Sequence, residues 1–222
     1  MCGIFGQISN SKINKENFEK LVKHSEQRGV DSSGLIYYDN NRYKISRADY
    51  NIEKLLNKLK PYNSHIVLGH SRLITNGLGD NQPVIRDNIC AIHNGIIVNE
   101  KEIWEKLTVQ RKYQIDSEVI VAIAEEYLKN NSDENKLVNQ ILSKCRGVVA
   151  CALLLPKRSK LLLFSNNGSL YVGYLKDDIY FASERYALDQ INCESIKQIR
   201  DEALILDIPF SEQNLLVIDD NS

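Results

Sequence analysis

The stretch MCGIFGQIS, residues 1–9, decides how the rest of this sequence is interpreted. An apolar run follows Cys2 directly and has the composition of a buried strand. Only Met1 precedes the cysteine, and chain ends are usually poorly ordered unless a sheet holds them. A buried structural thiol is therefore unexpected at position 2, and Cys2 calls for a chemical explanation.

Cys2 has the chemistry of an N-terminal nucleophile once Met1 is removed. Its free α-amine would have a pKa of about 8, far below that of lysine, so the amine could act as a base near neutral pH. Enzymes with an N-terminal nucleophile use this arrangement, in which the residue's own amine activates its own side chain. The alternative is a cysteine that lies under the sheet and has no catalytic role.

The composition is that of a soluble globular protein with ample material for a core. Of the 222 residues, 43% are hydrophobic and 26% are charged, and the net charge is −1. No basic surplus favours nucleic acid or an anionic membrane as a partner. The longest apolar runs, such as residues 148–156, are far shorter than the ~18 residues that span a bilayer. Because the N-terminus also lacks the features of a secretory signal, we expect a cytoplasmic protein.

The other cysteines point to neither a disulfide framework nor a metal site. The chain has five cysteines, an odd number, and none of them is spaced as CxxC. Four of them are interpreted as small buried hydrophobic residues. We expect no metal and no cofactor.

Hydrophobic periodicity predicts strands near both ends of the chain and helices between them. No linker or repeat divides the sequence, so residues 1–222 are expected to form one domain. The pattern favours an α+β fold of sheets with helices on their outer faces over regular βαβ alternation. Strands are expected at 3–8, 35–39, 42–48, 65–72, 88–99, 147–155, 160–165, 169–175, 178–183, 203–207 and 214–218, and helices at 14–27, 51–60, 99–108, 117–129, 134–144 and 184–190.

Three further stretches carry candidate site residues. In GHSRLITNG, residues 69–77, Arg72 could hold a carboxylate in a bidentate manner and Thr75 adds a hydroxyl. In AIHNGIIVN, residues 91–99, the Asn94 amide and the Gly95 N–H could form an oxyanion hole. Asp116 stands just before an apolar helix and could bind an ammonium group.

Each of these residues also has an ordinary structural interpretation. Arg72 could be a solvated surface arginine, Asn94-Gly95 a plain turn, and Asp116 a helix N-cap. Together, however, they supply a cation for an α-carboxylate, an anion for an α-ammonium and donors for an oxyanion. With Cys2 as nucleophile and base, the implied substrate is a free amino acid with a reactive side-chain acyl group.

These motifs resemble those of the class II glutamine amidotransferases, whose glutaminase domain is an N-terminal-nucleophile hydrolase. The similar stretches occur in the family's order over nearly the whole chain. They are MCGIFG (1–6), RGVDSSGL (28–35), GHSRLITNG (69–77), NQP (81–83), HNGIIVN (93–99), DSEVI (116–120) and, more weakly, RGVV (146–149) and YFASE (180–184).

The resemblance implies a four-layer αββα sandwich of two mostly antiparallel sheets, with the nucleophile at the start of a central strand. It also implies that the Cys2 thiolate attacks the side-chain amide of L-glutamine, releasing ammonia and leaving a glutamyl thioester that is hydrolysed to glutamate. Arg72 and Thr75 would then hold the α-carboxylate, Asp116 the α-ammonium, and Asn94 with Gly95 the oxyanion.

Other residues of the motifs are interpreted as supporting ones. His70 and His93 are expected to form hydrogen bonds behind the site rather than to carry protons, and Asp31 is expected to fix a turn. HNGIIVN and RGVDSSGL are most similar to the glutaminase half of glucosamine-6-phosphate synthase. Leu73 stands where that synthase usually has an aromatic residue, and leucine at this position is more similar to asparagine synthetase. Asn76 stands where the synthase often has histidine.

The sequence does not contain the synthase half that such glutaminases normally precede. The ammonia would therefore pass to a separate synthase or transferase protein, or to a domain that is missing from this chain. Two alternatives remain open at this point. One is an amidase of the same class that acts on another amide, and the other is a glutamine-sensing module without turnover.

Overall fold

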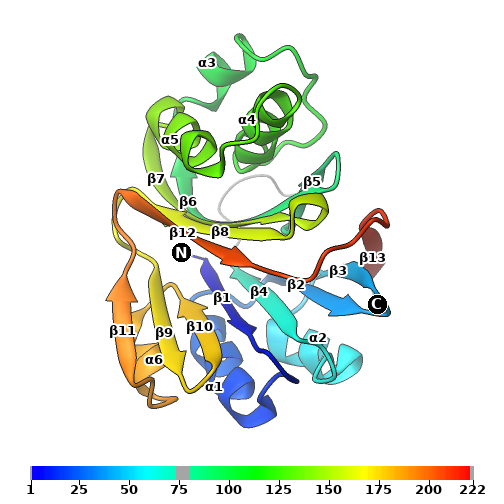
Figure 1. The fold of residues 1–222 in the computed structure, drawn as a ribbon, viewed down its shortest axis with the longest axis vertical. Helices are drawn as coiled ribbons and strands as arrows, with labels where there is room; N and C mark the ends of the chain where they lie inside the picture. Colours follow the sequence, from blue (N-terminus) through cyan, green and yellow to red (C-terminus); the bar gives the residue numbers. More distant parts are fainter. Residues whose placement is uncertain (1, 74–80, 221–222) are drawn as a thin grey trace.

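The computed structural model describes residues 2–73 and 81–220, apart from the side chains of the last two (Figure 1). The strands are β1 (Gly3–Ile8), β2 (Ser32–Asp39), β3 (Arg42–Ala48), β4 (Ile66–Arg72), β5 (Val84–Arg86), β6 (Ile89–Ile97), β7 (Gly147–Leu155), β8 (Lys160–Ser165), β9 (Tyr171–Leu175), β10 (Asp178–Ala182), β11 (Ser195–Gln198), β12 (Glu202–Asp207) and β13 (Leu216–Asp220). The helices are α1 (Lys15–Glu26), α2 (Ile52–Leu59), α3 (Glu100–Trp104), α4 (Glu118–Leu128), α5 (Glu134–Lys144), α6 (Arg185–Asp189) and the 3-10 helix η1 (Pro156–Arg158).

These elements form four layers, which confirms the predicted α+β sandwich. One sheet has the strand order β11-β9-β10-β1-β4-β2-β3-β13 and the other has the order β12-β8-β7-β6-β5. Their pairings are antiparallel except for β13 with β3. Figure 1 shows α3, α4 and α5 outside the smaller sheet and α1, α2 and α6 outside the larger one.

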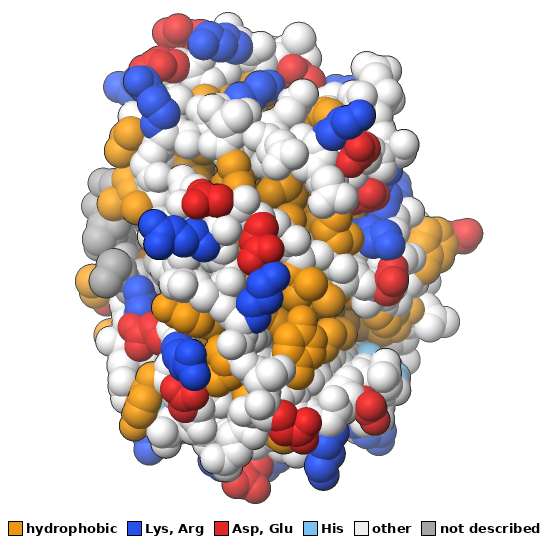
Figure 2. Space-filling view, turned by 60° about the vertical axis from the view of Figure 1, so that its left-hand side comes forward, with side chains coloured by type: hydrophobic (Ala, Val, Ile, Leu, Met, Phe, Trp, Pro, Cys, Tyr) orange, Lys and Arg blue, Asp and Glu red, His pale blue; other side chains and the backbone are white. Residues whose placement is uncertain are grey.

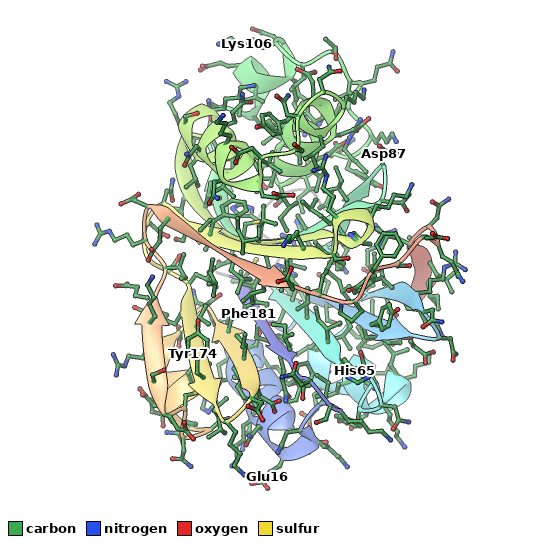
Figure 3. The ribbon with its side chains drawn as sticks, viewed as in Figure 1. Glu16, His65, Asp87, Lys106, Tyr174 and Phe181 are labelled. Carbon is green, nitrogen blue, oxygen red and sulfur yellow. The ribbon has the colours of Figure 1, made fainter. Side chains whose placement is uncertain are left out.

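Three apolar cores hold the layers together, one at each helix–sheet interface and one between the sheets. On α1, Phe18, Leu21 and Val22 form an apolar face that is buried against the outer face of the larger sheet. Phe181, labelled in Figure 3, belongs to the core between the two sheets. The alternation of side chains along each strand thus serves two cores at once, because successive residues face opposite layers.

β1 has a central position in the larger sheet, between β10 and β4. Ile4 is the partner of His70 in β4, and Phe5 is the partner of both Gly69 in β4 and Ala182 in β10. Because β1 is paired on both sides, Cys2 directly precedes a firmly held central strand. This explains how a residue so near the chain end can be ordered.

Most predicted elements are confirmed, and the differences have physical reasons. Asn40 and Asn41 have φ values of 50° and 59° and form the predicted tight connection between β2 and β3. The helix expected at 99–108 ends at Trp104. The strand expected at 88–99 is confirmed as β6, which continues through Gly95 in register with β7. β5 and β11, of three and four residues, are too short to leave a periodic signal.

The surface matches the balanced composition. Figure 2 shows lysine and arginine side chains interspersed with aspartate and glutamate on the face in view, without a large area of one sign. None of the described helices is long and apolar enough to cross a membrane.

Candidate active site

The predicted site residues come from two strand ends, the interior of a third strand and the segment before a helix. Cys2 precedes β1, Arg72 ends β4, Asn94 and Gly95 lie in β6, and Asp116 stands two residues before α4. Arg72 and Asn94 are each 5% exposed, and Cys2 is partly buried. Thr75, and Asn76 next to it, lie outside the described residues.

The Cys2 thiol lies in the combined field of Arg72 and Asp116. Burial, the largest effect, raises the pKa of the Cys2 thiol, while a backbone hydrogen bond with Leu73 and the charge of Arg72 lower it and Asp116 raises it. The net shift is upward from the ordinary value. Both charged groups therefore act on the pKa of the thiol, and the thiol needs a base to become a nucleophile at neutral pH.

Arg28 fastens the nucleophile's backbone, a contact that the sequence interpretation missed. Its Nε donates a hydrogen bond of 2.8 Å to the carbonyl oxygen of Cys2, and its guanidinium forms an ion pair with Glu184. Both residues belong to quoted motifs, RGVDSSGL and YFASE, so the signal was present. What the sequence could not show is that two segments 156 residues apart meet at Cys2.

The loop after Arg28 also contacts the other side of the site. A Cβ at Gly29 would lie 2.3 Å from both the carbonyl carbon of Arg72 and the nitrogen of Leu73, so only glycine permits this approach. The backbone N–H of Asp31 donates to the carbonyl of Arg72 at 3.0 Å. One loop thus holds both the strand that carries the thiol and the strand that carries the guanidinium.

Asn94 and Gly95 do not form a turn, so that interpretation is wrong. They pair with Ala150 and Val149 of β7 inside a continuous strand. Gly95 has φ +156°, and a Cβ there would lie 1.9 Å from the carbonyl oxygen of Val148. The Asn94 Nδ2 donates to the hydroxyl of Ser183 at 3.3 Å. A side-chain carboxamide and a backbone N–H are the kinds of donor that oxyanion holes use.

Asp116 is held against β6 rather than capping a helix. Its Oδ2 accepts a hydrogen bond of 2.7 Å from the N–H of Ile97, and the N-cap of α4 is Ser117. The N-cap interpretation of Asp116 is therefore wrong. The carboxylate keeps acceptor capacity for a ligand, because an ionised carboxylate has about four lone-pair positions.

The two histidines differ in their surroundings. His93 Nε2 donates to the carbonyl of Val148 at 3.1 Å and Nδ1 lies 2.8 Å from the Ser117 hydroxyl, as the supporting role predicts. Burial lowers the pKa of His93, and it lowers the pKa of His70 to about 3. The His70 ring makes no hydrogen bond of ordinary geometry to the described residues, although the carbonyl of His93 acts on it. Both rings are therefore neutral near pH 7.

A buried ion-pair network supports the start of α4, and the sequence interpretation missed it. Arg86, 3% exposed, pairs with Glu118 at 2.5 Å and with Glu125 at 2.7 Å. Glu118 also accepts hydrogen bonds from the backbone N–H groups of Lys112 and Tyr113. Glu118 of the DSEVI stretch thus fixes the loop that leads to Asp116.

Solved structures share this architecture. Glutamine phosphoribosylpyrophosphate amidotransferase from B. subtilis superposes with a TM-score of 0.72 and 20% identity, over 96% of this chain and 50% of that one. A glutamine aminotransferase class-II domain protein from Silicibacter pomeroyi gives 0.57 and 15%, over 93% and 99%. At these identities the likeness shows the fold alone, which is that of an N-terminal-nucleophile hydrolase.

Sequence comparisons define the family. The glutamine amidotransferase domain model matches residues 70–190. Glutamine–fructose-6-phosphate aminotransferase (isomerizing) is 30% identical in Bradyrhizobium diazoefficiens, over 85% of this chain and 32% of that protein, and 30% identical in Helicobacter pylori, over 96% and 40%. The chain therefore belongs to the glutamine amidotransferase family, whose reaction is glutamine hydrolysis with ammonia transfer. It spans only 32% to 40% of the length of these relatives.

Proposed function

We propose that this chain hydrolyses L-glutamine with Cys2 as the nucleophile and the Cys2 α-amine as the base. The observation that carries the proposal is the place of Cys2 beside Arg72. Gly3 of β1 pairs with Ser71 of β4, so the partly buried Cys2 and Arg72 lie at the same end of two adjacent strands, and the charges of Arg72 and Asp116 both act on the thiol. The proposal covers residues 1–222 as one glutaminase domain. A cytoplasmic location fits it, because all five cysteines are free and a reducing compartment keeps a thiol nucleophile active.

In the proposed reaction, the α-amine takes the thiol proton and the thiolate attacks the side-chain carbonyl carbon of glutamine. The carbonyl oxygen becomes an oxyanion that accepts hydrogen bonds from Asn94 Nδ2 and the Gly95 N–H. The C–N bond then breaks, the amine returns its proton to the leaving nitrogen, and ammonia departs. Water attacks the resulting thioester with help from the same amine, which releases glutamate and restores the thiol.

Recognition of glutamine is assigned to the two opposite charges that act on the thiol, those of Arg72 and Asp116. Arg72 would bind the α-carboxylate, with Thr75 as a further donor, and Asp116 would bind the α-ammonium. This pair fits the zwitterion of a free amino acid, whereas a peptide amide or acyl conjugate would leave one or both charges unpaired. A buried charge without a partner is costly, so the pair also selects against such substrates.

An experiment on processed protein tests the proposal. Intact mass identifies the form that begins at Cys2, and glutamate release from glutamine is measured for wild type, Cys2→Ala and Cys193→Ala. Cys193, the other partly buried free cysteine, serves as the matched control. We expect glutamate and ammonia in equal amounts from wild type and the control, and none from Cys2→Ala.

Wild-type protein that begins at Cys2 and releases no glutamate would contradict the proposal. Glutamine binding without turnover would then indicate a sensing module, and release from other amides would indicate an amidase of different specificity.

We further propose that the ammonia passes to an acceptor carried by a separate protein or a further domain. An exposed apolar face beside Asn94 supports this. Ile96 is 52% exposed and lies on the side of β6 that carries Asn94, because alternate residues of a strand face the same way. Val98, just after the end of β6, is 72% exposed. Val148, the partner of Ile96 in β7, is 39% exposed. We expect a synthase-like partner to co-purify with the wild-type protein and with Val217→Asp, a substitution on β13. We expect it not to co-purify with Val98→Asp.

A further inference from the structure

Ser183, which directly follows β10, connects the two halves of the proposed chemistry. Its side chain is buried, and its hydroxyl oxygen lies 3.0 Å from the N–H of Ile4, 3.4 Å from the carbonyl of Ile4 and 3.3 Å from Asn94 Nδ2. Its backbone N–H donates to the same Ile4 carbonyl at 2.9 Å. One oxygen atom therefore touches both the strand that follows Cys2 and the amide proposed to bind the oxyanion.

The arrangement of donors determines which end of the Asn94 amide faces the serine. A hydroxyl has one proton, and the carbonyl of Ile4 can only accept it. The remaining lone pairs of the Ser183 oxygen accept from the Ile4 N–H and from a second donor, so Asn94 presents its Nδ2 rather than its Oδ1. One N–H of that amide is thereby occupied, and the other is left for an incoming oxyanion.

A carboxamide that could rotate freely would present its oxygen to the oxyanion in part of its conformations. That contact would be repulsive where an attractive one is needed. Donors that are oriented before the reaction cost no reorganisation when the charge develops, and this accounts for their large contribution to rate. The hydrogen bond between Ser183 and Asn94 therefore matters chiefly in the transition state, when the side-chain carbonyl oxygen of glutamine becomes negative.

We propose that Ser183 is a positioning residue, which orients the Asn94 amide and sets its place relative to the strand that carries Cys2. This inference rests on the proposed glutaminase function. Ser183 itself touches neither the thiol nor the substrate in this scheme. Its effect is expected on kcat rather than on KM for glutamine, because α-carboxylate and α-ammonium recognition lies elsewhere in the site.

The first test compares Ser183→Ala with Ser64→Ala. Ser64 is the matched control, because its buried hydroxyl also donates to a strand carbonyl, Ile66 at 2.6 Å, and accepts from the Ile66 and Tyr38 N–H groups. Its loop lies at the opposite end of β4 from Arg72. We expect Ser183→Ala to lower kcat about 10-fold with KM within about 2-fold, since the full loss of an oxyanion donor costs ~100-fold or more. Ser64→Ala should leave both unchanged.

The second test asks whether Ser183 acts through Asn94. In an Asn94→Ala background, Ser183→Ala should lower kcat by less than about 2-fold, because the amide that it orients is already absent. Ser183→Thr, which keeps the hydroxyl, should restore most of the activity. Thermal unfolding of each variant shows that the protein is folded under the assay conditions.

The outcomes separate this inference from the function on which it rests. Wild-type protein without glutaminase activity overturns both. If the wild type is active, an unchanged kcat in Ser183→Ala overturns the role of Ser183 but not the glutaminase function. The same holds if Ser183→Ala lowers kcat equally with and without the Asn94 amide. Equal losses in folded Ser183→Ala and Ser183→Thr would likewise contradict a role for the hydroxyl.

Discussion

The chemistry of single residues in this site depends on opposing effects on one sulfur atom. Burial raises the pKa of the Cys2 thiol more than Arg72 and the Leu73 backbone lower it. The thiol is therefore protonated at neutral pH, and a base must act in each turnover. An α-amine on the same residue is suited to this task, because no rearrangement of the chain is needed to bring it near the sulfur.

Arg72 and Asn94 are expected to affect different kinetic constants. Arg72→Ala should raise KM for glutamine by ~10–100-fold, because the α-carboxylate loses a charge-assisted hydrogen bond. Asn94→Ala should lower kcat by about 100-fold with a smaller change in KM, because its donor acts on the developing oxyanion. Steady-state kinetics of glutamate release measures both. An unchanged kcat in Asn94→Ala would rule out the oxyanion role.

Among the elements, β6 and the start of α4 form one unit around Asp116. The Ile97 N–H holds the Asp116 carboxylate from the β6 side. Two residues later, Glu118 is fully buried and paired with Arg86, which comes from β5. The position of a substrate-binding carboxylate thus depends on a charged network on the helix side of the smaller sheet.

Glu118→Gln is expected to lower the free energy of unfolding by about 3 kcal/mol, because it leaves the buried Arg86 charge with a weaker partner. KM for glutamine should also rise, since the loop before Asp116 loses its acceptor. Glu102→Gln breaks an exposed pair with Arg146 and should cost less than about 1 kcal/mol. Urea denaturation of both variants measures the difference. Equal, small effects would show that the network does not stabilise the fold.

For the whole molecule, the four-layer arrangement places ionisable side chains deep between its sheets. His70 lies on β4 and is fully buried, with its pKa lowered to about 3 by burial, by Arg72 and by His93. The unfolded chain binds a proton at this residue below about pH 6.5, whereas the folded protein does not until about pH 3. Stability is therefore expected to fall as the pH is lowered through this window.

His70→Gln tests this dependence between about pH 5.5 and 7.5, above the range in which most carboxylates titrate. The slope of unfolding free energy against pH should decrease by up to ~1.4 kcal/mol per unit below pH 6, the value for one proton. The control is His65→Gln, because His65, labelled in Figure 3, is exposed and meets water in both states. An unchanged slope in His70→Gln would contradict the prediction.

The sequence by itself determined the α+β class and most of the elements of this protein, while the four-layer arrangement was implied by the resemblance to a known family. Strand and helix periodicities are local, since alternate or every third and fourth side chains must face a core, so they can be read without tertiary information. The same holds for the chemical types at the site, because Cys2, Arg72, Asn94, Gly95 and Asp116 stand in recognisable stretches. Short strands such as β5 gave no such signal.

Only the tertiary structure decided how these residues act together. Asn94-Gly95 and Asp116 each had a plausible local interpretation, a turn and a helix cap, and both were excluded by contacts with β7 and with Ile97. The contacts of Arg28 with Cys2 and of Ser183 with Asn94 join segments 26 and 89 residues apart. Contacts of this kind depend on which strands pair and which layers meet, and no local pattern in the chain records them.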